Sequence, residues 1–178
     1  AFHLDGARLF NALVAKNESA EQYGHLFDTI SICLSKGLGA PIGSILLGSK
    51  EHIAKALRIR KLLGGAMRQV GFLAAAGIYA LDNHINRLEE DHQKAKEIGA
   101  VLSVASYVTK LEEIETNIVI FYVDEKIGAD NFIKKMKENN ILLTPMGAGR
   151  IRIVTHLDYS NEMHEVLLKA LQNFKSKN

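Results

Sequence analysis

The chain has 178 residues, of which 47% are hydrophobic and 24% charged, and its formal net charge is +2 at pH 7. This length and composition predict a globular protein with one sizeable core or two smaller ones. Both signs of charge are interspersed, which argues against nucleic acid or a membrane surface as partner, and no apolar run is long enough for a transmembrane helix. The single cysteine, Cys33, excludes an internal disulfide and favours a reducing, cytoplasmic compartment.

The first residues, AFHLDGAR, predict a strand that ends at Asp5 and turns through Gly6 into a helix over residues 7–16. The helix carries apolar residues at the spacing of one helical face. A short helix over residues 19–24 follows, with Ser19 as its N-cap. This order places a carboxylate, that of Asp5, at the end of a strand.

Lys36 lies on the turn between two short, β-branched apolar runs, residues 30–34 and 45–47, which predict buried strands. The turn is rich in glycine and contains Pro41, so its backbone can bend tightly and approach a ligand closely. Among small residues and between buried strands, Lys36 is expected to be partly desolvated. Desolvation favours the neutral form of an amine, which attacks a carbonyl to give a Schiff base. The alternative is an ordinary surface lysine on a glycine-rich loop.

Two helices are predicted next. Ser49 caps a basic amphipathic helix over residues 50–63. Residues 66–81, AMRQVGFLAAAGIYAL, are apolar nearly all round, which predicts a helix buried in a core or at a subunit interface, with core packing favoured for most of its residues. Arg68, expected at the N-terminus of this helix, is the residue least suited to a core.

The pattern changes over residues 82–90, and we place the domain boundary between residues 84 and 85. A long polar helix follows, and His84 and His92 are assigned to its solvated face; no pair of histidines, Cys33 or carboxylates has convincing zinc-ligand spacing. Beyond it the predicted elements alternate: strands at 116–123, 141–145 and 150–156, and helices at 128–140 and 161–174. This order predicts a small α+β domain whose mostly antiparallel sheet is covered by helices on one face.

The run RIRIVTH, residues 150–156, predicts a strand with alternating faces. Arg150, Arg152 and His156 lie on one face, and the apolar residues Ile151 and Ile153 on the other. Two arginines on one side are typical of a solvent-facing surface. The alternative is that one of them binds a substrate carboxylate, because the planar guanidinium matches the two oxygens of that group.

Asp5 and Lys36 come in an order that pyridoxal phosphate (PLP) enzymes use: an acid at a strand end, then a loop lysine one strand later. The runs HLDGARLFNA, CLSKGLGAPIGS, KLLGGAMRQVGFLAAAG and IRIVTH resemble the low-specificity L-threonine aldolases, a branch of the fold-type I PLP family that also includes the β-eliminating lyases. The four blocks come in the family's order at similar spacings. The resemblance covers essentially the whole chain.

The resemblance implies an α/β fold in which residues 1–84 are the C-terminal part of the fold-type I PLP-dependent large domain and residues 85–178 a small C-terminal α+β domain. Chains of the family are nearly twice as long, and their preceding segment supplies a phosphate-binding loop and two histidines near the cofactor and substrate. We therefore interpret the chain as the C-terminal half of such an enzyme.

The resemblance also implies a role for each candidate residue. Lys36 is the catalytic lysine and holds the aldehyde carbon of PLP as a Schiff base, while Asp5 pairs with the pyridinium nitrogen. Arg152 matches the arginine of the family's IRLVTH block and binds the substrate carboxylate. Arg8 is a second candidate near that carboxylate or the cofactor. Arg68 approaches the cofactor phosphate from the same or a neighbouring subunit.

The implied reaction is the retro-aldol cleavage of L-threonine or L-allo-threonine, small-molecule β-hydroxy-α-amino acids, to glycine and acetaldehyde. The implied assembly is a homo-oligomer, a dimer or tetramer. Two alternatives stay open: another fold-type I lyase, such as a β-eliminating lyase, and a catalytically inactive C-terminal fragment that serves at most as an assembly surface.

Overall fold

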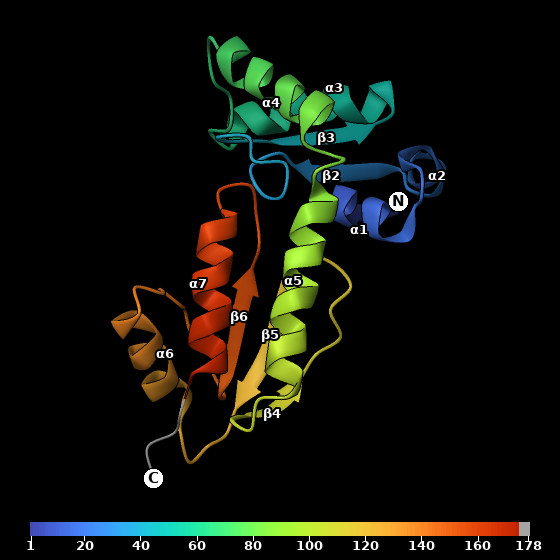
Figure 1. Cartoon of the computed structure of the whole chain (residues 1–178). Coiled ribbons are helices and arrows are strands. Elements are labelled where there is room, and N and C mark those ends of the chain that lie inside the picture. Colours follow the sequence, from blue (N-terminus) through green and yellow to red (C-terminus); the bar gives the residue numbers. More distant parts are fainter. Residues whose placement is uncertain (175–178) are drawn as a thin grey trace. The chain divides into compact units, whose positions relative to one another are not determined.

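A computed structural model describes residues 1–174, and the chain divides into two compact units, Ala1–Leu88 and Glu89–Asn178. Each unit is built around its own three-stranded sheet (Figure 1). Within the described part of the chain, no helix is both long and apolar enough to cross a bilayer. The assignment of the two units to particular domains of a longer enzyme stays a prediction.

The first unit contains β1 (His3–Asp5), α1 (Leu9–Lys16), α2 (Ala20–Leu26), β2 (Thr29–Cys33), β3 (Ser44–Gly48), α3 (Lys50–Leu62) and α4 (Gly71–Asn83). Strands β1 and β2 are parallel, with Asp5 opposite Ser31, whereas β2 and β3 are antiparallel, with Cys33 opposite Ser44. The last residues of β1 and β2 and the first residue of β3 therefore lie at the same edge of the sheet.

The core of the first unit lies between this sheet and its helices. Ile30 and Ile32 alternate along β2 with less buried residues and pack against Leu9 and Leu13 of α1. A second apolar cluster supports the connection between β2 and β3 and consists of Leu34, Leu38, Ala40, Ala80 and Leu88. The β2–β3 connection thus packs against Ala80, near the end of α4, and against Leu88, which begins the following helix.

Helix α4 differs from its prediction in two ways. It begins at Gly71 rather than at residue 66, because Gln69 has a φ of 51°, which a right-handed helix cannot accommodate. Its apolar side chains are also mostly exposed: Phe72 is 87% exposed, and the buried residues of the helix are Gly77 and Ala80. The prediction that most of them pack in a core is wrong for this chain, because α4 is buried only at Gly77 and Ala80, near Leu34 and the β2–β3 connection. Packing at a subunit interface stays a prediction.

The second unit contains α5 (Leu88–Ser103, of which Leu88 is assigned to the first unit), β4 (Val108–Leu111), β5 (Ile118–Val123), α6 (Ala129–Glu138), β6 (Arg150–Val154) and α7 (Asn161–Gln172). The strand order is β4-β5-β6 with both pairs antiparallel, which confirms the predicted sheet type. Strand β4 was not predicted, because it is short and its central residues, Thr109 and Lys110, are polar. The strand predicted over 141–145 is wrong: its backbone pairing is one isolated bridge between Pro145 and Ile151.

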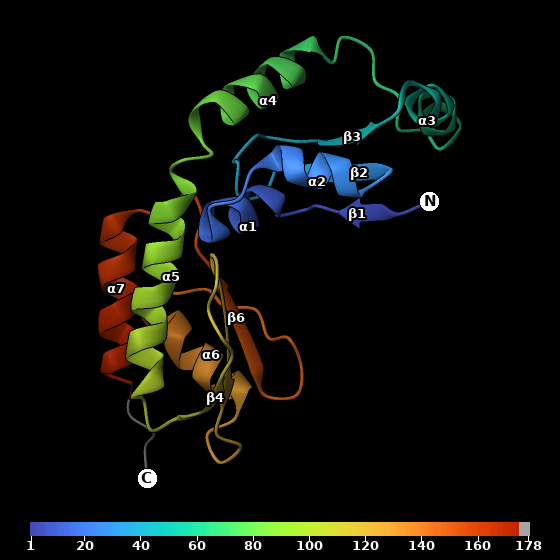
Figure 2. The same ribbon diagram turned by 90° about the vertical axis from the view of Figure 1, so that its right-hand side faces the viewer.

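One apolar core joins the sheet of the second unit to its three helices. Val119 and Phe121 of β5 and Ile151 and Ile153 of β6 are buried in the same cluster as residues of α5, α6 and α7. Figure 2 shows α5 and α7 side by side, on one side of the sheet that contains β4 and β6. The alternation predicted for residues 150–156 is confirmed, since Ile151 and Ile153 are buried and Arg152 is exposed.

His92 does not lie on a solvated face of α5 as predicted. The buried stripe of this helix recurs every three or four residues, and it includes Leu88, Asp91, His92, Ala95, Ile98, Gly99 and Leu102. His92 falls within that stripe, and burial lowers the pKa of its imidazole. The burial of His92 could not be predicted from the polar composition of the segment, because the buried stripe itself contains Asp91 and His92.

Candidate active site

Lys36 lies in the loop that joins β2 to β3 and is closed by two backbone hydrogen bonds. The Leu34 N–H donates to the Gly43 carbonyl at 2.9 Å, and the Leu34 carbonyl accepts from the Ala40 N–H at 3.0 Å. Within the loop the Gly39 N–H donates to the Lys36 carbonyl at 3.0 Å. The backbone at Lys36 is therefore held in a tight turn at the C-terminal end of β2.

A side chain at the residue after Lys36 would have to displace the side chain of Asn11. A Cβ atom on Gly37 would lie 2.6 Å from Asn11 Oδ1 and 3.2 Å from Leu88 Cδ2. Because Gly37 and Leu38 form the buried side of the loop, Lys36 is left on its exposed side. The expected partial desolvation of Lys36 is thus wrong for this chain.

His84 provides a support for this loop that the sequence did not reveal. The residue caps the C-terminus of α4, and its Nδ1 lies 2.6 Å from the Leu38 carbonyl. A carbonyl only accepts hydrogen bonds, so Nδ1 carries the proton in this contact. His84 is half-buried rather than solvated, and its partner is 46 positions away in the sequence. No local pattern could have indicated this pairing.

Asp5 ends β1 at the same edge of the sheet. Its Oδ1 accepts the Ala7 N–H at 3.2 Å, and the carboxylate is exposed. The next residue, Gly6, donates its N–H to the Ser31 carbonyl at 2.8 Å, and a Cβ atom at Gly6 would lie only 2.8 Å from that oxygen. The turn from β1 into α1 therefore depends on a glycine that lets its backbone pack against β2.

Arg8 is the N-cap residue of α1 and is half-buried. It follows Asp5 by three positions, so it belongs to the same turn at the end of β1. Because β1 and β2 run parallel, the structure brings the β1 turn with Asp5 and Arg8 and the β2 loop with Lys36 to one edge of the sheet. This edge combines one carboxylate, one amine and one guanidinium.

Arg68 and Arg152 do not belong to the turns that follow β1 and β2. Arg68 is exposed and lies in the turn before α4, not in its first helical turn, so the prediction that it lies at the N-terminus of this helix is wrong. Arg152 lies on β6 of the second unit, opposite Ile120 of β5, on the face of the sheet that is turned away from the core.

Arg152 lines a groove of about 830 Å³ in the second unit. Its polar lining also includes His156, Tyr159 and Glu162. Its apolar lining consists of Ile141, Leu142, Leu143, Met146, Ile153, Val154, Met163, Val166 and Leu167. A guanidinium beside apolar side chains suits a small carboxylate that carries a short carbon chain.

The edge with Asp5 and Lys36 fits two contacts of PLP. An exposed carboxylate can accept a hydrogen bond from a pyridinium N–H, and a primary amine can bind an aldehyde carbon. Asp5 and Lys36 are exposed, so neither is enclosed by the first unit itself. The carboxylate and the amine at this edge are therefore compatible with PLP.

Comparison with known structures defines the class of protein. The Leishmania major threonine aldolase structure matches 96% of this chain with a TM-score of 0.74 and 20% sequence identity, and the match covers 50% of that chain. The chain is therefore an α/β protein with the fold of the corresponding part of that structure. Residues 1–126 match the family model described as Beta-eliminating lyase, and the chain belongs to this family.

Two curated relatives are named as low-specificity L-threonine aldolases. The low specificity L-threonine aldolase of Escherichia coli K12 is 44% identical over 162 residues, which cover 91% of this chain and 47% of the relative. The low-specificity L-threonine aldolase 1 of Arabidopsis thaliana is 41% identical over 157 residues, covering 86% of this chain and 44% of the relative. The chain thus spans about half the length of the curated relatives it matches.

Proposed function

We propose that this chain contributes the lysine and the ring-nitrogen carboxylate of a PLP-dependent aldehyde-lyase that cleaves L-threonine or L-allo-threonine to glycine and acetaldehyde. The observation that carries the proposal is the placement of Asp5 and Lys36 at one edge of the parallel pair β1 and β2. Membership of the β-eliminating lyase family and the names of the relatives support it.

Each residue of the edge has a distinct task in this proposal. The Lys36 amine would hold the cofactor through its aldehyde carbon. The Asp5 carboxylate accepts the hydrogen bond of the ring nitrogen and so keeps the proton on that atom. When bound, PLP supplies an electron sink for the electron pair that remains at Cα after the Cα–Cβ bond breaks.

Arginines complete the proposed site. Arg152 binds the α-carboxylate of a β-hydroxy-α-amino acid, which fixes the direction of the bond to be broken. Arg8, in the turn of Asp5, is proposed as a second contact of the carboxylate or cofactor. Arg68 is proposed as a contact of the cofactor phosphate, and its exposed turn before α4 leaves it accessible to such a group.

We also propose that the protein is a cytoplasmic homo-oligomer, a dimer or tetramer. Exposed apolar side chains on α3, α4 and their connection support an assembly surface, and they include Leu62, Leu63, Phe72, Ile78 and Tyr79. Surfaces of this kind are usually covered by a partner. The free, half-buried Cys33 is consistent with a reducing compartment.

A second candidate function is β-elimination, which the description of the matching family favours. Both reactions use the same amine and carboxylate. They differ in the bond that breaks, since elimination expels a leaving group from Cβ whereas aldol cleavage releases an aldehyde. Products from L-threonine and from S-methyl-L-cysteine separate the two, because only the former can yield acetaldehyde.

The proposal is tested by adding PLP to the chain, recording the visible spectrum, reducing with borohydride and mapping the modified peptide. We expect one reduced adduct, on Lys36, which is lost in Lys36→Ala and retained in Lys50→Ala, a control on the exposed first turn of α3. Release of acetaldehyde from L-threonine is measured on the same samples. A folded chain without an adduct on Lys36, or with equal labelling of Lys50, would contradict the proposed role of Lys36.

A further inference from the structure

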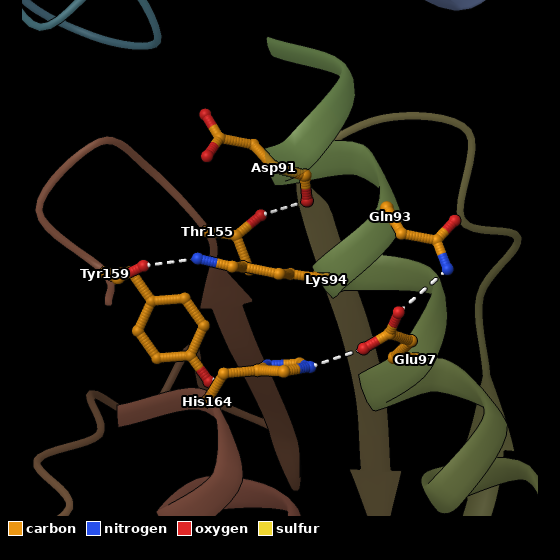
Figure 3. A network of polar contacts seen from close by, with 7 residues as sticks. All are labelled: Asp91, Gln93, Lys94, Glu97, Thr155, Tyr159 and His164. Atoms are coloured by element: carbon orange, nitrogen blue, oxygen red, sulfur yellow. Dashed lines mark hydrogen bonds and ion pairs between the residues drawn. The ribbon is translucent and has the colours of Figure 1, made fainter. Parts of the chain in front are cut away.

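A hydrogen-bonded network links α5, α7 and the turn after β6 in the second unit (Figure 3). His164 Nε2 lies 2.8 Å from Glu97 Oε2, and His164 Nδ1 lies 3.1 Å from the Tyr159 hydroxyl. Gln93 Nε2 donates to Glu97 Oε1 at 2.8 Å. These contacts form one chain of hydrogen bonds from the surface of α5 to the ring of Tyr159.

The direction of each bond follows from the chemistry of its atoms. A carboxylate only accepts, so His164 Nε2 carries the proton and donates it to Glu97. The other nitrogen of a neutral ring then accepts, so the Tyr159 O–H donates to His164 Nδ1. Burial raises the pKa of Tyr159, which keeps the phenol protonated, and hydrogen bonds from Gln93 and His164 lower the pKa of Glu97, which keeps the carboxylate ionised. Both shifts are consistent with the assigned directions.

Helix α5 also holds both ends of the turn. The Tyr159 carbonyl accepts a hydrogen bond from Lys94 Nζ at 2.7 Å, and the same ammonium lies 5.5 Å from the centroid of the Tyr159 ring. At the other end, Thr155 Oγ1 donates to the Asp91 carbonyl at 2.6 Å (Figure 3). Residues 156–158 between these anchors are exposed. The turn is thus fixed by polar contacts at its ends rather than by apolar packing along its length.

Tyr159 and Arg152 line the same groove of about 830 Å³. The turn forms part of the wall of this groove, so its conformation decides the shape of the space in front of Arg152. A partly buried network whose polar groups are hydrogen-bonded favours one conformation of the turn, even where it adds little to the free energy of unfolding.

We propose that Tyr159, held by His164 and Glu97, is a positioning residue that keeps the turn after β6 in the conformation in which Arg152 binds a small-molecule carboxylate. The inference rests on the part of the proposed function that assigns the substrate carboxylate to Arg152. Loss of the hydroxyl releases one anchor of the turn, and the groove is then formed for a smaller fraction of the time. The apparent affinity for a carboxylate is proportional to that fraction, so it falls as the fraction falls.

The test titrates the full chain, without cofactor, with propionate and follows the Arg152 Nε–H signal by NMR. Tyr159→Phe removes only the hydroxyl and is expected to weaken propionate binding about 3- to 10-fold, the effect of one lost hydrogen bond. Amide exchange at residues 157–159 is expected to accelerate by a similar factor. The matched control is Tyr107→Phe, which removes another buried hydroxyl of the same unit, bonded to the Leu171 carbonyl at 2.8 Å. It is expected to lower stability without changing the propionate affinity.

A conservative rescue separates positioning from general stability. Glu97→Gln keeps an oxygen that accepts from His164 and should bind propionate like the wild type, whereas Glu97→Leu should behave like Tyr159→Phe. Unchanged affinity in Tyr159→Phe, equal weakening in Tyr107→Phe, or an Arg152 signal that does not respond to propionate would each overturn the inference. Cleavage of L-threonine with added PLP is assayed separately. If the Arg152 signal responds to propionate but L-threonine is not cleaved, the aldolase proposal is contradicted and the inference about Tyr159 is not.

Discussion

Gly6→Ala tests whether the turn that carries Asp5 depends on close packing against β2. The added Cβ would lie 2.8 Å from the Ser31 carbonyl and 3.3 Å from both Ile30 Cγ2 and Leu9 Cβ, whereas ordinary contacts are 3.4–4 Å. The oxygen belongs to a paired strand and cannot move freely. Relief of the clash must lengthen the hydrogen bond from the Gly6 N–H to that oxygen. Overpacking costs about 1–3 kcal/mol and the weakened bond about 1 kcal/mol, so we expect a loss of about 2–4 kcal/mol.

Amide exchange at Ile30 and Ile32 of β2 measures this loss within the first unit. A cost of at least ~2 kcal/mol accelerates exchange by about 30-fold or more. Gly24→Ala is the matched control, because nothing lies within 4 Å of a Cβ at that position of α2, and alanine favours a helix. It should slow exchange or leave it unchanged. Exchange in Gly6→Ala within about 2-fold of the wild type, a difference under ~0.5 kcal/mol, would refute the argument from close packing.

Three further perturbations probe other parts of the chain. Phe132→Ala, which empties a fully buried ring site in the second unit, should cost about 3–5 kcal/mol in urea unfolding, while the exposed Val104→Ala should stay within about 0.5 kcal/mol. Ser49→Ala removes the hydroxyl that accepts the His52 N–H at 3.2 Å and should cost about 1 kcal/mol, seen as fraying of α3 in amide exchange. The pKa of Glu97 is lower in the folded state than its ordinary value. The ionised carboxylate therefore stabilises the fold fully above the ordinary glutamate pKa, and this stabilisation is lost as pH falls through the lowered pKa. Urea unfolding at neutral and acidic pH should therefore show a smaller acid-induced loss in Glu97→Leu than in the wild type.

Elements with strong local signals could be predicted from the sequence. The apolar alternation of β6 and the apolar run of β2 gave the correct strands, and the caps Ser19 and Ser49 gave the starts of α2 and α3. These signals lie within a few residues of the element that they define.

Features that depend on distant partners could not be predicted in the same way. The burial of His92 follows from the stripe of α5 that packs in the core, and the pairing of β4 depends on β5. The start of α4 is set by the backbone of Gln69, for which glutamine itself gives no signal. Each of these outcomes is decided by tertiary packing or by a single backbone conformation.

The candidate site was predicted only in part. The order of Asp5 and Lys36 suggested their chemistry, but their common edge depends on the parallel pairing of β1 with β2. The exposure of Lys36 contradicts the expectation of desolvation, because the buried positions of the loop are taken by Gly37 and Leu38. The roles of Arg8, Arg68 and Arg152 stay predictions.

The double backbone contact of Leu34 has a consequence for the mobility of Lys36. The Leu34 N–H and carbonyl hold Gly43 and Ala40, so both halves of the loop are joined to the residue that directly follows β2. We therefore expect the Cα atom of Lys36 to move little, while its exposed amine exchanges among side-chain rotamers. We expect the amine to change binding partners by rotation about side-chain bonds alone, on the nanosecond scale or faster and without a rearrangement of the loop.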